Sequence, residues 1–356
     1  MTRKLNFASG PAALPEAVLR RAQIALLDLD GSGIGILEHS HRGPEFGRVL
    51  DRTEAAIREV GGIGDEFAVL FVTASATHHF AMVPRSFLGP GETADYCHTG
   101  TWSGKAIDEA RRVGSVHVAC TSEPGFAAIP ASFAWSAHPR YVHYTSNETI
   151  YGTQWPAPPV APGPLVCDAS SDLFSRPIAL DNHALIYAGA QKNLGPSGIS
   201  LVIARKDFLE TGRADLPPLD QYRTYARQHS LYNTPNTFGV YMIGEVVAWI
   251  RAEGGLAAMA ERNARKAAVL YDFLDQSRAF RPHAEPGSRS LMNVTFRGAT
   301  TALEETLIAR AEERGMSGLR GHRSIGGMRA SIYNAFPEEG VHRLVQLLDE
   351  VEREAG

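Results

Sequence analysis

The sequence predicts an α/β fold in which a mostly parallel sheet is covered by helices. Short apolar runs of strand length alternate with segments of helical periodicity from about residue 16 to 250, as in sheets built from strand–helix–strand units. Several runs are apolar throughout and stop at a polar residue. Buried parallel strands have this pattern, and their carboxyl ends open onto the ligand-binding edge of the sheet.

Length and composition indicate two domains in a globular protein. The chain has 356 residues, of which 44% are hydrophobic and 21% charged, which exceeds the usual size of a single core. We expect a large domain over 16–254 and a smaller α+β domain formed by 1–15 and 255–356. A net charge of −4 at pH 7 provides no basic surface for nucleic acid or an anionic membrane. The N-terminus has no hydrophobic signal region and no run spans a bilayer, so we expect a cytoplasmic protein.

The N-terminal part is predicted to form an extended arm and two helices. Asn6–Pro11 forms the arm, which could reach over a site. A helix starts at Pro15, and its apolar positions recur at helical spacing: Val18, Leu19, Ala22, Leu26 and Leu27. His41 and Arg42 precede a helix from about Glu45 to Val60. Arginine donors near a helix start suit an anionic group, although such a pair is also typical of a solvated loop.

A second possible anion site follows the strand Phe67–Val72. The small residues of Thr73–Thr77 lead into a helix over Phe80–Phe87, so their backbone N–H groups could surround a phosphate. No glycine fingerprint accompanies them. The adjacent His78 and His79 would face different directions, so we expect no metal site here.

The strand Asp95–His98 and a short turn precede Trp102, which starts a helix to about Arg112. A tryptophan at the ligand edge of a sheet can stack on a planar cofactor ring, or it can fill the core. The remaining strands of the large domain are predicted at 116–120, 141–144, 164–168, 185–189 and 199–204. The three cysteines lie in or beside strands without metal-binding spacing, which indicates buried thiols.

Two polar residues follow neighbouring strands and should face one pocket. Asp168 ends one apolar strand, and Lys192 follows the next one along the chain. A buried lysine can form an imine with an aldehyde, and if this aldehyde is pyridoxal phosphate, Asp168 could pair with the pyridine nitrogen. The chain has only five lysines, so Lys192 is less expected to be an ordinary surface residue. An isolated pair would also suit a surface lysine and a helix cap, so neighbouring motifs must decide.

The C-terminal part begins after a helix through Trp249 and a break at Glu253–Gly255. Its predicted elements are a helix at 256–274, a strand at 291–296, a helix at 302–314, a strand at 328–333 and a helix at 340–354. A second His-Arg pair, His322 and Arg323, precedes Arg329 in a glycine-rich turn region. Two His-Arg pairs and a further arginine suggest a substrate with two anionic ends.

Taken together, these segments resemble the phosphoserine aminotransferases, a branch of the class V, fold-type I enzymes that use pyridoxal phosphate. The resemblance covers nearly the whole chain in order. Its motifs are Asn6–Pro11, His39–Gly43, the Trp102 turn, Asn147–Ile150, Ala188–Asn193, Asn233–Pro235, and Gly321–Arg323 through Met328–Ala335. The fold that it implies has a seven-stranded sheet in the large domain.

The resemblance also implies roles for single residues. Lys192 would bind the cofactor covalently and move the proton at the substrate's Cα, Asp168 would pair with the pyridinium, and Trp102 would stack on the ring. Other cofactor contacts would come from Thr149, Gln191, Ala76 and Thr77 and, across the interface of a homodimer with shared sites, Asn233 and Thr234. Arg329 would hold the α-carboxylate. The remaining substrate contacts would come from Ser9, His41, Arg42, His322 and Arg323.

The implied reaction moves the amino group of L-glutamate to 3-phosphooxypyruvate and yields O-phospho-L-serine and 2-oxoglutarate, a step of serine biosynthesis. 4-Phosphohydroxy-L-threonine, in pyridoxine biosynthesis, is a possible second substrate. Some members of the family carry a glycine-rich turn with an arginine where this chain has Thr73–Thr77. Because this chain has no arginine there, it stays open whether the turn contacts the substrate through a cation. The relative activity on phosphoserine and phosphohydroxythreonine stays open for the same reason.

Two alternatives are a desulfurase or lyase within the same fold and, from another functional class, a pyridoxal-binding protein without turnover that acts as a regulator or scaffold. A desulfurase would need a mobile nucleophilic cysteine, whereas the three cysteines here lie in strand-like contexts. A pyridoxal-binding protein without turnover would lack the proton-transferring lysine or the substrate arginines, but Lys192, Asp168 and Arg329 are all present.

Overall fold

The structure is a computed structural model that describes residues 3–355. Its main feature is a seven-stranded sheet of order β2-β10-β9-β8-β5-β3-β4. The strands are β2 (Phe67–Val72), β3 (Thr93–His98), β4 (Ser115–Thr121), β5 (Val142–Thr145), β8 (Leu165–Asp168), β9 (His183–Gly189) and β10 (Ser200–Arg205). Only β10 runs antiparallel to its neighbours within this sheet. The predicted mostly parallel sheet is therefore confirmed.

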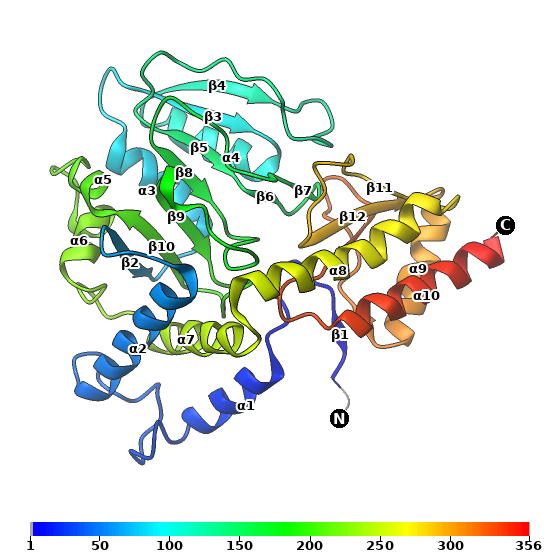
Figure 1. The fold of residues 1–356 in the computed structure, drawn as a ribbon, viewed down its shortest axis with the longest axis horizontal. Coiled ribbons are helices and arrows are strands. Elements are labelled where there is room, and N and C mark those ends of the chain that lie inside the picture. Colours follow the sequence, from blue (N-terminus) through cyan, green and yellow to red (C-terminus); the bar gives the residue numbers. More distant parts are fainter. Residues whose placement is uncertain (1–2, 356) are drawn as a thin grey trace.

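Helices cover both faces of the large sheet (Figure 1). They are α1 (Glu16–Ala25), α2 (Pro44–Gly61), α3 (Ala76–Phe87), α4 (Thr101–Arg111), α5 (Lys206–Glu210), α6 (Tyr222–Arg227) and α7 (Thr237–Ala252). Successive strand residues point to opposite faces, so Val69 belongs to one apolar cluster with α1, α2 and α7, and Leu70 to another with α3 and α4. Both faces are thus buried, which explains why these strands are apolar throughout.

A smaller α+β region carries the C-terminal part of the chain. Its sheet contains β11 (Phe280–Pro282), β12 (Asn293–Gly298) and β14 (Met328–Ser331), and its helices are α8 (Gly255–Gln276), α9 (Thr301–Glu313) and α10 (Glu338–Ala355). The N-terminal strand β1 (Leu5–Asn6) joins this region by parallel pairing with β13 (Met316–Ser317).

Helix α8 extends between the two regions (Figure 1). Its first turns contribute Leu256 and Met259 to a core of the large sheet, whereas Ala267 and Leu270 belong to the separate core of the smaller region. The predicted domain boundary at 254/255 stays a prediction.

The structure corrects the predicted N-terminal helix. Val18 and Ala22 are buried as expected, but α1 ends at Ala25, and Leu26 and Leu27 lie in the turn that follows, where Leu27 is 80% exposed. Sequence analysis also missed β1, β11, β13 and the hairpin of β6 (Asn147–Glu148) and β7 (Thr153–Gln154). Strands of two or three residues are too short to show a periodic pattern.

The three cysteines are buried free thiols, as predicted. His79 is a core residue whose ring nitrogens bond Tyr222 Oη at 2.8 Å and Ser200 Oγ at 2.6 Å. Among residues 3–355, no helix combines the length and apolar character needed to cross a bilayer.

Candidate active site

A cavity of about 170 Å³ opens at the carboxyl ends of the parallel strands. Asp168 reaches it from the end of β8, and Lys192 reaches it from the turn after β9. The prediction that these two residues face one pocket is confirmed. The other predicted site residues that line it are Ser9, Ala76, Thr77, Trp102, Thr149, Gln191, His322 and Arg329.

The amine of Lys192 contacts two hydroxyl groups. It lies 2.6 Å from Thr149 Oγ1 and 2.8 Å from Ser171 Oγ, and these two oxygens are 2.6 Å apart. Burial lowers the pKa of Lys192 to about 8, although the carboxylates of Asp168 and Glu148 oppose this shift. With this pKa, about a tenth of the amine is unprotonated and nucleophilic at pH 7, far more than for an ordinary lysine.

The carboxyl of Asp168 is held on one oxygen only. Its Oδ1 accepts hydrogen bonds from the backbone N–H of Ser170 at 3.0 Å and from Ser170 Oγ at 2.6 Å. No side-chain or backbone donor of residues 3–355 bonds Oδ2. This oxygen can therefore accept a hydrogen bond from a protonated ring nitrogen. Burial raises the pKa of Asp168, while the Ser170 hydrogen bonds and the nearby Lys192 ammonium counteract the shift.

Trp102 lies in the first turn of α4 and lines the cavity. The Nζ atoms of Lys192 and Lys105 are 5.6 and 4.7 Å from the centre of its ring. Its indole Nε1 is buried and bonds no group of the described chain. On another wall, Ala76 and Thr77 form the start of the twelve-residue helix α3. Free N–H groups at such a start favour an anion.

The N-terminal arm and β14 bring Arg329 to the same cavity. Arg329 is 7% exposed, and its guanidinium donates to Ser9 Oγ at 2.7 Å and to the carbonyl oxygen of Thr149 at 3.2 Å. Its Nε bonds nothing in the part of the chain described. His322 lies on the rim, where partial burial and the charges of Arg329, Arg323 and Lys105 lower its pKa.

Five predicted site residues do not line the cavity. His41 and Arg42 lie in the segment before α2, Asn233 and Thr234 lie in the segment before α7, and Arg323 follows His322 outward. Their predicted roles stay predictions.

Several residues in or next to the site were not predicted from the sequence. Ser170 and Ser171 lie two and three residues after Asp168, and their small polar side chains just beyond a strand end were an available signal. Glu148, which is 1% exposed, accepts a hydrogen bond from the backbone N–H of Trp102 at 3.0 Å. Its place between Asn147 and Thr149 was the only hint in the sequence.

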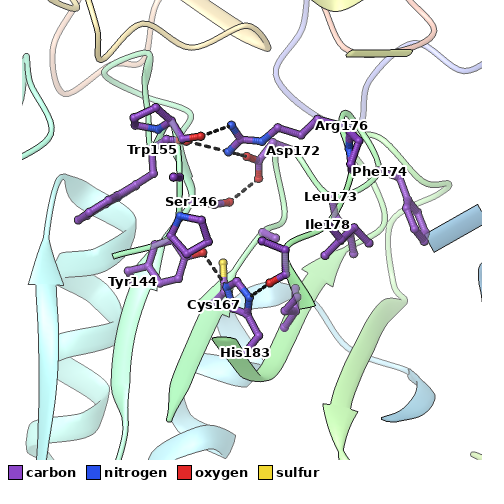
Figure 2. A pocket seen from close by; sticks show the side chains of 17 residues that line it. Tyr144, Ser146, Trp155, Cys167, Asp172, Leu173, Phe174, Arg176, Ile178 and His183 are labelled. Atoms are coloured by element: carbon purple, nitrogen blue, oxygen red, sulfur yellow. Dashed lines mark hydrogen bonds and ion pairs between the residues drawn. The ribbon is translucent and has the colours of Figure 1, made fainter. Parts of the chain in front are cut away.

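A second hollow of about 220 Å³ contains none of the predicted site residues (Figure 2). Tyr144, Cys167 and His183 lie on one side of it. His183 Nδ1 donates to the carbonyl of Ala179 at 2.6 Å, so Nε2 accepts from the Tyr144 hydroxyl at 2.8 Å. Asp172 accepts from Gln154 Nε2 at 2.9 Å and from Ser146 Oγ. These polar groups are already hydrogen-bonded within the protein, so none of them is free to bind a ligand in this hollow.

The sequence profile of the aminotransferase class-V family matches residues 4–344. The chain belongs to the class-V aminotransferases. A relative from Herpetosiphon aurantiacus, named phosphoserine aminotransferase, is 50% identical over 348 residues, which cover 96% of this chain and 97% of the relative.

Solved structures of class-V aminotransferases share the fold. That of phosphoserine aminotransferase from Bacillus circulans subsp. alkalophilus has a TM-score of 0.97 at 44% identity, with 99% of each chain covered. The PLP-bound phosphoserine aminotransferase from Trichomonas vaginalis has a TM-score of 0.93 at 35% identity, with 98% of this chain and 100% of that chain covered.

Proposed function

We propose that this class-V aminotransferase is a pyridoxal-phosphate-dependent phosphoserine transaminase. It moves the amino group of L-glutamate to 3-phosphooxypyruvate, giving O-phospho-L-serine and 2-oxoglutarate for L-serine biosynthesis. The observation that carries the proposal is the convergence of Lys192, Asp168 and Arg329 on one cavity beside Trp102. Relatives such as the 50% identical protein from Herpetosiphon aurantiacus support the substrate.

The unpartnered polar atoms of the cavity fit pyridoxal phosphate. Asp168 Oδ2 suits the pyridine nitrogen, and the start of α3 at Ala76 and Thr77 suits the phosphate. Lys192 would bind the aldehyde, and Trp102 would stack on the ring. Thr149 and Gln191 complete the cradle, and Gln191 Oε1 is a buried acceptor that bonds no group of residues 3–355. When bound, this cofactor withdraws electrons from the substrate and makes the proton on Cα acidic.

The residues of the chain then divide the work of proton transfer. The amine of Lys192, when it is not bound to the cofactor, would take the proton from the substrate's Cα and, in the reverse direction, return a proton to that carbon. A pKa of about 8 suits this exchange, because a general base works best when its pKa is near the operating pH. Asp168 keeps the ring nitrogen protonated, while Thr149 and Ser171 hold the amine in position.

Substrate binding is assigned to the cations of the cavity. Arg329 would hold the α-carboxylate with the help of Ser9, which already bonds it. His322 and Arg323 would hold the distal phosphate or the distal carboxylate of glutamate by charge-assisted hydrogen bonds. 4-Phosphohydroxy-L-threonine carries the same two anionic ends, and we propose it as a secondary substrate.

The remaining predicted contacts require a homodimer with shared sites. Large apolar side chains are exposed on α1 and the segment after it, namely Leu19, Ile24, Leu26, Leu27, Ile34 and Leu37. Ile24 is 67% and Leu37 62% exposed, and several large apolar side chains exposed along one stretch of chain are typical of a protein interface. A second copy covering this surface would bring its own His41 and Arg42 near the cavity. Asn233 and Thr234 would reach the cofactor phosphate in the same way.

A half-reaction titration tests the substrate. We expect phosphoserine, phosphohydroxythreonine and glutamate to bleach the visible absorption band of the bound cofactor at far lower concentrations than serine or alanine. Equal responses to serine and phosphoserine would overturn the substrate assignment.

Analytical ultracentrifugation would test the dimer. A protein that is monomeric at its working concentration would contradict the proposal that two subunits share each site. The proposed location is the cytoplasm, where the three free thiols would stay reduced.

A further inference from the structure

Glu148 is a buried carboxyl group at the active site to which the proposed chemistry gives no role. It is 1% exposed and belongs to β6, between the cavity-lining residues Asn147 and Thr149. Glu148 itself does not line the cavity. A carboxyl group is costly to bury unless it is paired, so its contacts indicate what it does.

The principal contact of Glu148 is the start of helix α4. Its Oε2 accepts the backbone N–H of Trp102 at 3.0 Å, and Ile150 donates a longer hydrogen bond of 3.5 Å to Oε1. The first N–H groups of a helix have no partner within the helix, so a side-chain oxygen that accepts one of them stabilises the helix start. Ser103 Oγ accepts the preceding N–H groups of Thr99 and Gly100 at 2.9 and 3.0 Å. Glu148 therefore extends the capping of this turn to Trp102.

The side chain of Glu148 fits closely against the backbone of Gly100. A Cβ atom added to Gly100 would lie 2.4 Å from Cγ and 2.6 Å from Oε2 of Glu148. No other residue type fits at position 100 without displacing Glu148. The carboxyl and the helix start therefore hold each other in one arrangement.

The charged groups around Glu148 belong to the active site. They are the amine of Lys192, the guanidinium of Arg329 and the carboxyl of Asp168. Burial raises the pKa of Glu148 to about 8, against the opposing effects of the Trp102 N–H and the Lys192 charge.

We propose that Glu148 is a positioning residue that holds Trp102 against the cofactor ring by capping α4. It touches neither the cofactor nor the substrate. The inference rests on the proposed function only in taking pyridoxal phosphate as the ring on which Trp102 stacks.

The test compares Glu148→Ala and Glu148→Gln with a control carboxyl elsewhere. Glu304 is 9% exposed, lies outside the cavity in α9, and accepts the backbone N–H of Gly298 at 3.0 Å, so Glu304→Ala removes a similar contact. The measurements are the visible circular dichroism of bound pyridoxal phosphate, the affinity of the apo-protein for pyridoxal phosphate, and thermal unfolding. None of them requires an amino-acid substrate.

We expect Glu148→Ala to weaken pyridoxal phosphate binding roughly tenfold, as the loss of a helix cap suggests, and to halve the visible dichroism at least. Glu148→Gln should stay within about threefold of the wild type, because its side-chain oxygen accepts the same N–H. Glu304→Ala should lower thermal stability and leave the dichroism unchanged.

Wild-type dichroism and affinity in Glu148→Ala would overturn the inference. If Glu148→Ala does not fold, Glu148→Gln decides, because a loss of affinity beyond threefold in a folded glutamine variant would refute the capping role. A wild-type protein that shows no visible dichroism with pyridoxal phosphate would instead contradict the proposed function.

Discussion

The chain places two lysines in its interior, and they are surrounded in different ways. Lys266 on α8 is 0% exposed, and its amine donates to the carbonyl oxygens of Ile332 at 2.8 Å, Tyr333 at 2.6 Å and Phe336 at 3.3 Å. Lys192 is only partly buried, because its amine faces a cavity and contacts the hydroxyl groups of Thr149 and Ser171. Burial lowers the pKa of both.

The difference shows that a lowered pKa alone does not identify a reactive lysine. The three carbonyl groups around Lys266 can only accept hydrogen bonds, so they fix the amine as a donor, and it lines neither the active-site cavity nor the hollow of Figure 2. Hydroxyl groups can donate as well as accept, so the amine of Lys192 can lose its proton and keep its partners. Reactivity follows from exchangeable partners and an adjacent space.

The largest expected effect comes from Lys192→Ala. The variant should bind no cofactor covalently and lose turnover by about 10⁴-fold or more, since it lacks both the attachment point and the general base. Its thermal unfolding should remain close to that of the wild type. Absorbance after removal of free pyridoxal phosphate measures the attachment, and a variant that retains the band would show that another amine is used.

Lys266→Met should lower stability and leave cofactor binding unchanged, which is the reverse of Lys192→Ala. It leaves three buried carbonyl groups without a donor, so we expect the free energy of unfolding to fall by about 2–4 kcal/mol. The cofactor band per folded molecule should not change. Lys206→Met is the control, because Lys206 is exposed on α5 and should matter by less than about 0.5 kcal/mol. Equal denaturation curves for the two variants would contradict the structural role.

The pH dependence should separate the reactive lysine from the structural one. The rate at which the apo-protein takes up pyridoxal phosphate should rise with pH and level off above about 8, because only the unprotonated amine of Lys192 attacks the aldehyde. The lowered pKa also means that the unfolded chain binds more protons between about 8 and 10.5, so this residue's unfavourable contribution to stability fades as pH rises through that range.

Stopped-flow absorbance from pH 6.5 to 9.5 measures this rate. Lys266→Met should show the same profile as the wild type. A rate that does not change with pH would mean that Lys192 is already unprotonated, or that a different step limits uptake, and either result would contradict the prediction.

The smallest effect is expected from Ser171→Ala. It removes one of the two hydroxyl partners of Lys192 and leaves Thr149, so turnover should fall by roughly two- to fivefold, the effect of one modest hydrogen bond. Ser175→Ala is matched to it, because Ser175 is also buried but bonds the carbonyl of Asp172 at 2.7 Å. If both variants lost equal activity, the prediction that the Ser171 hydroxyl supports turnover through its contact with Lys192 would be contradicted.

Much of this arrangement could be predicted from local sequence. Apolar runs identified the central strands, and the position of Asp168 and Lys192 at strand ends correctly placed both in one pocket. The contact between Arg329 and Ser9 joins residues at opposite ends of the chain, so no spacing could reveal it. Scarcity of lysine drew attention to Lys192, but it applies equally to Lys266. Only the three-dimensional surroundings separate them.

The pairing of β1 with β13 has a consequence for biosynthesis. The strand Leu5–Asn6 leaves the ribosome long before its partner Met316–Ser317 is made. The arm that carries Ser9 must therefore stay unengaged until that partner has been synthesised. A nascent chain could complete the large sheet well before it has a site able to hold a substrate.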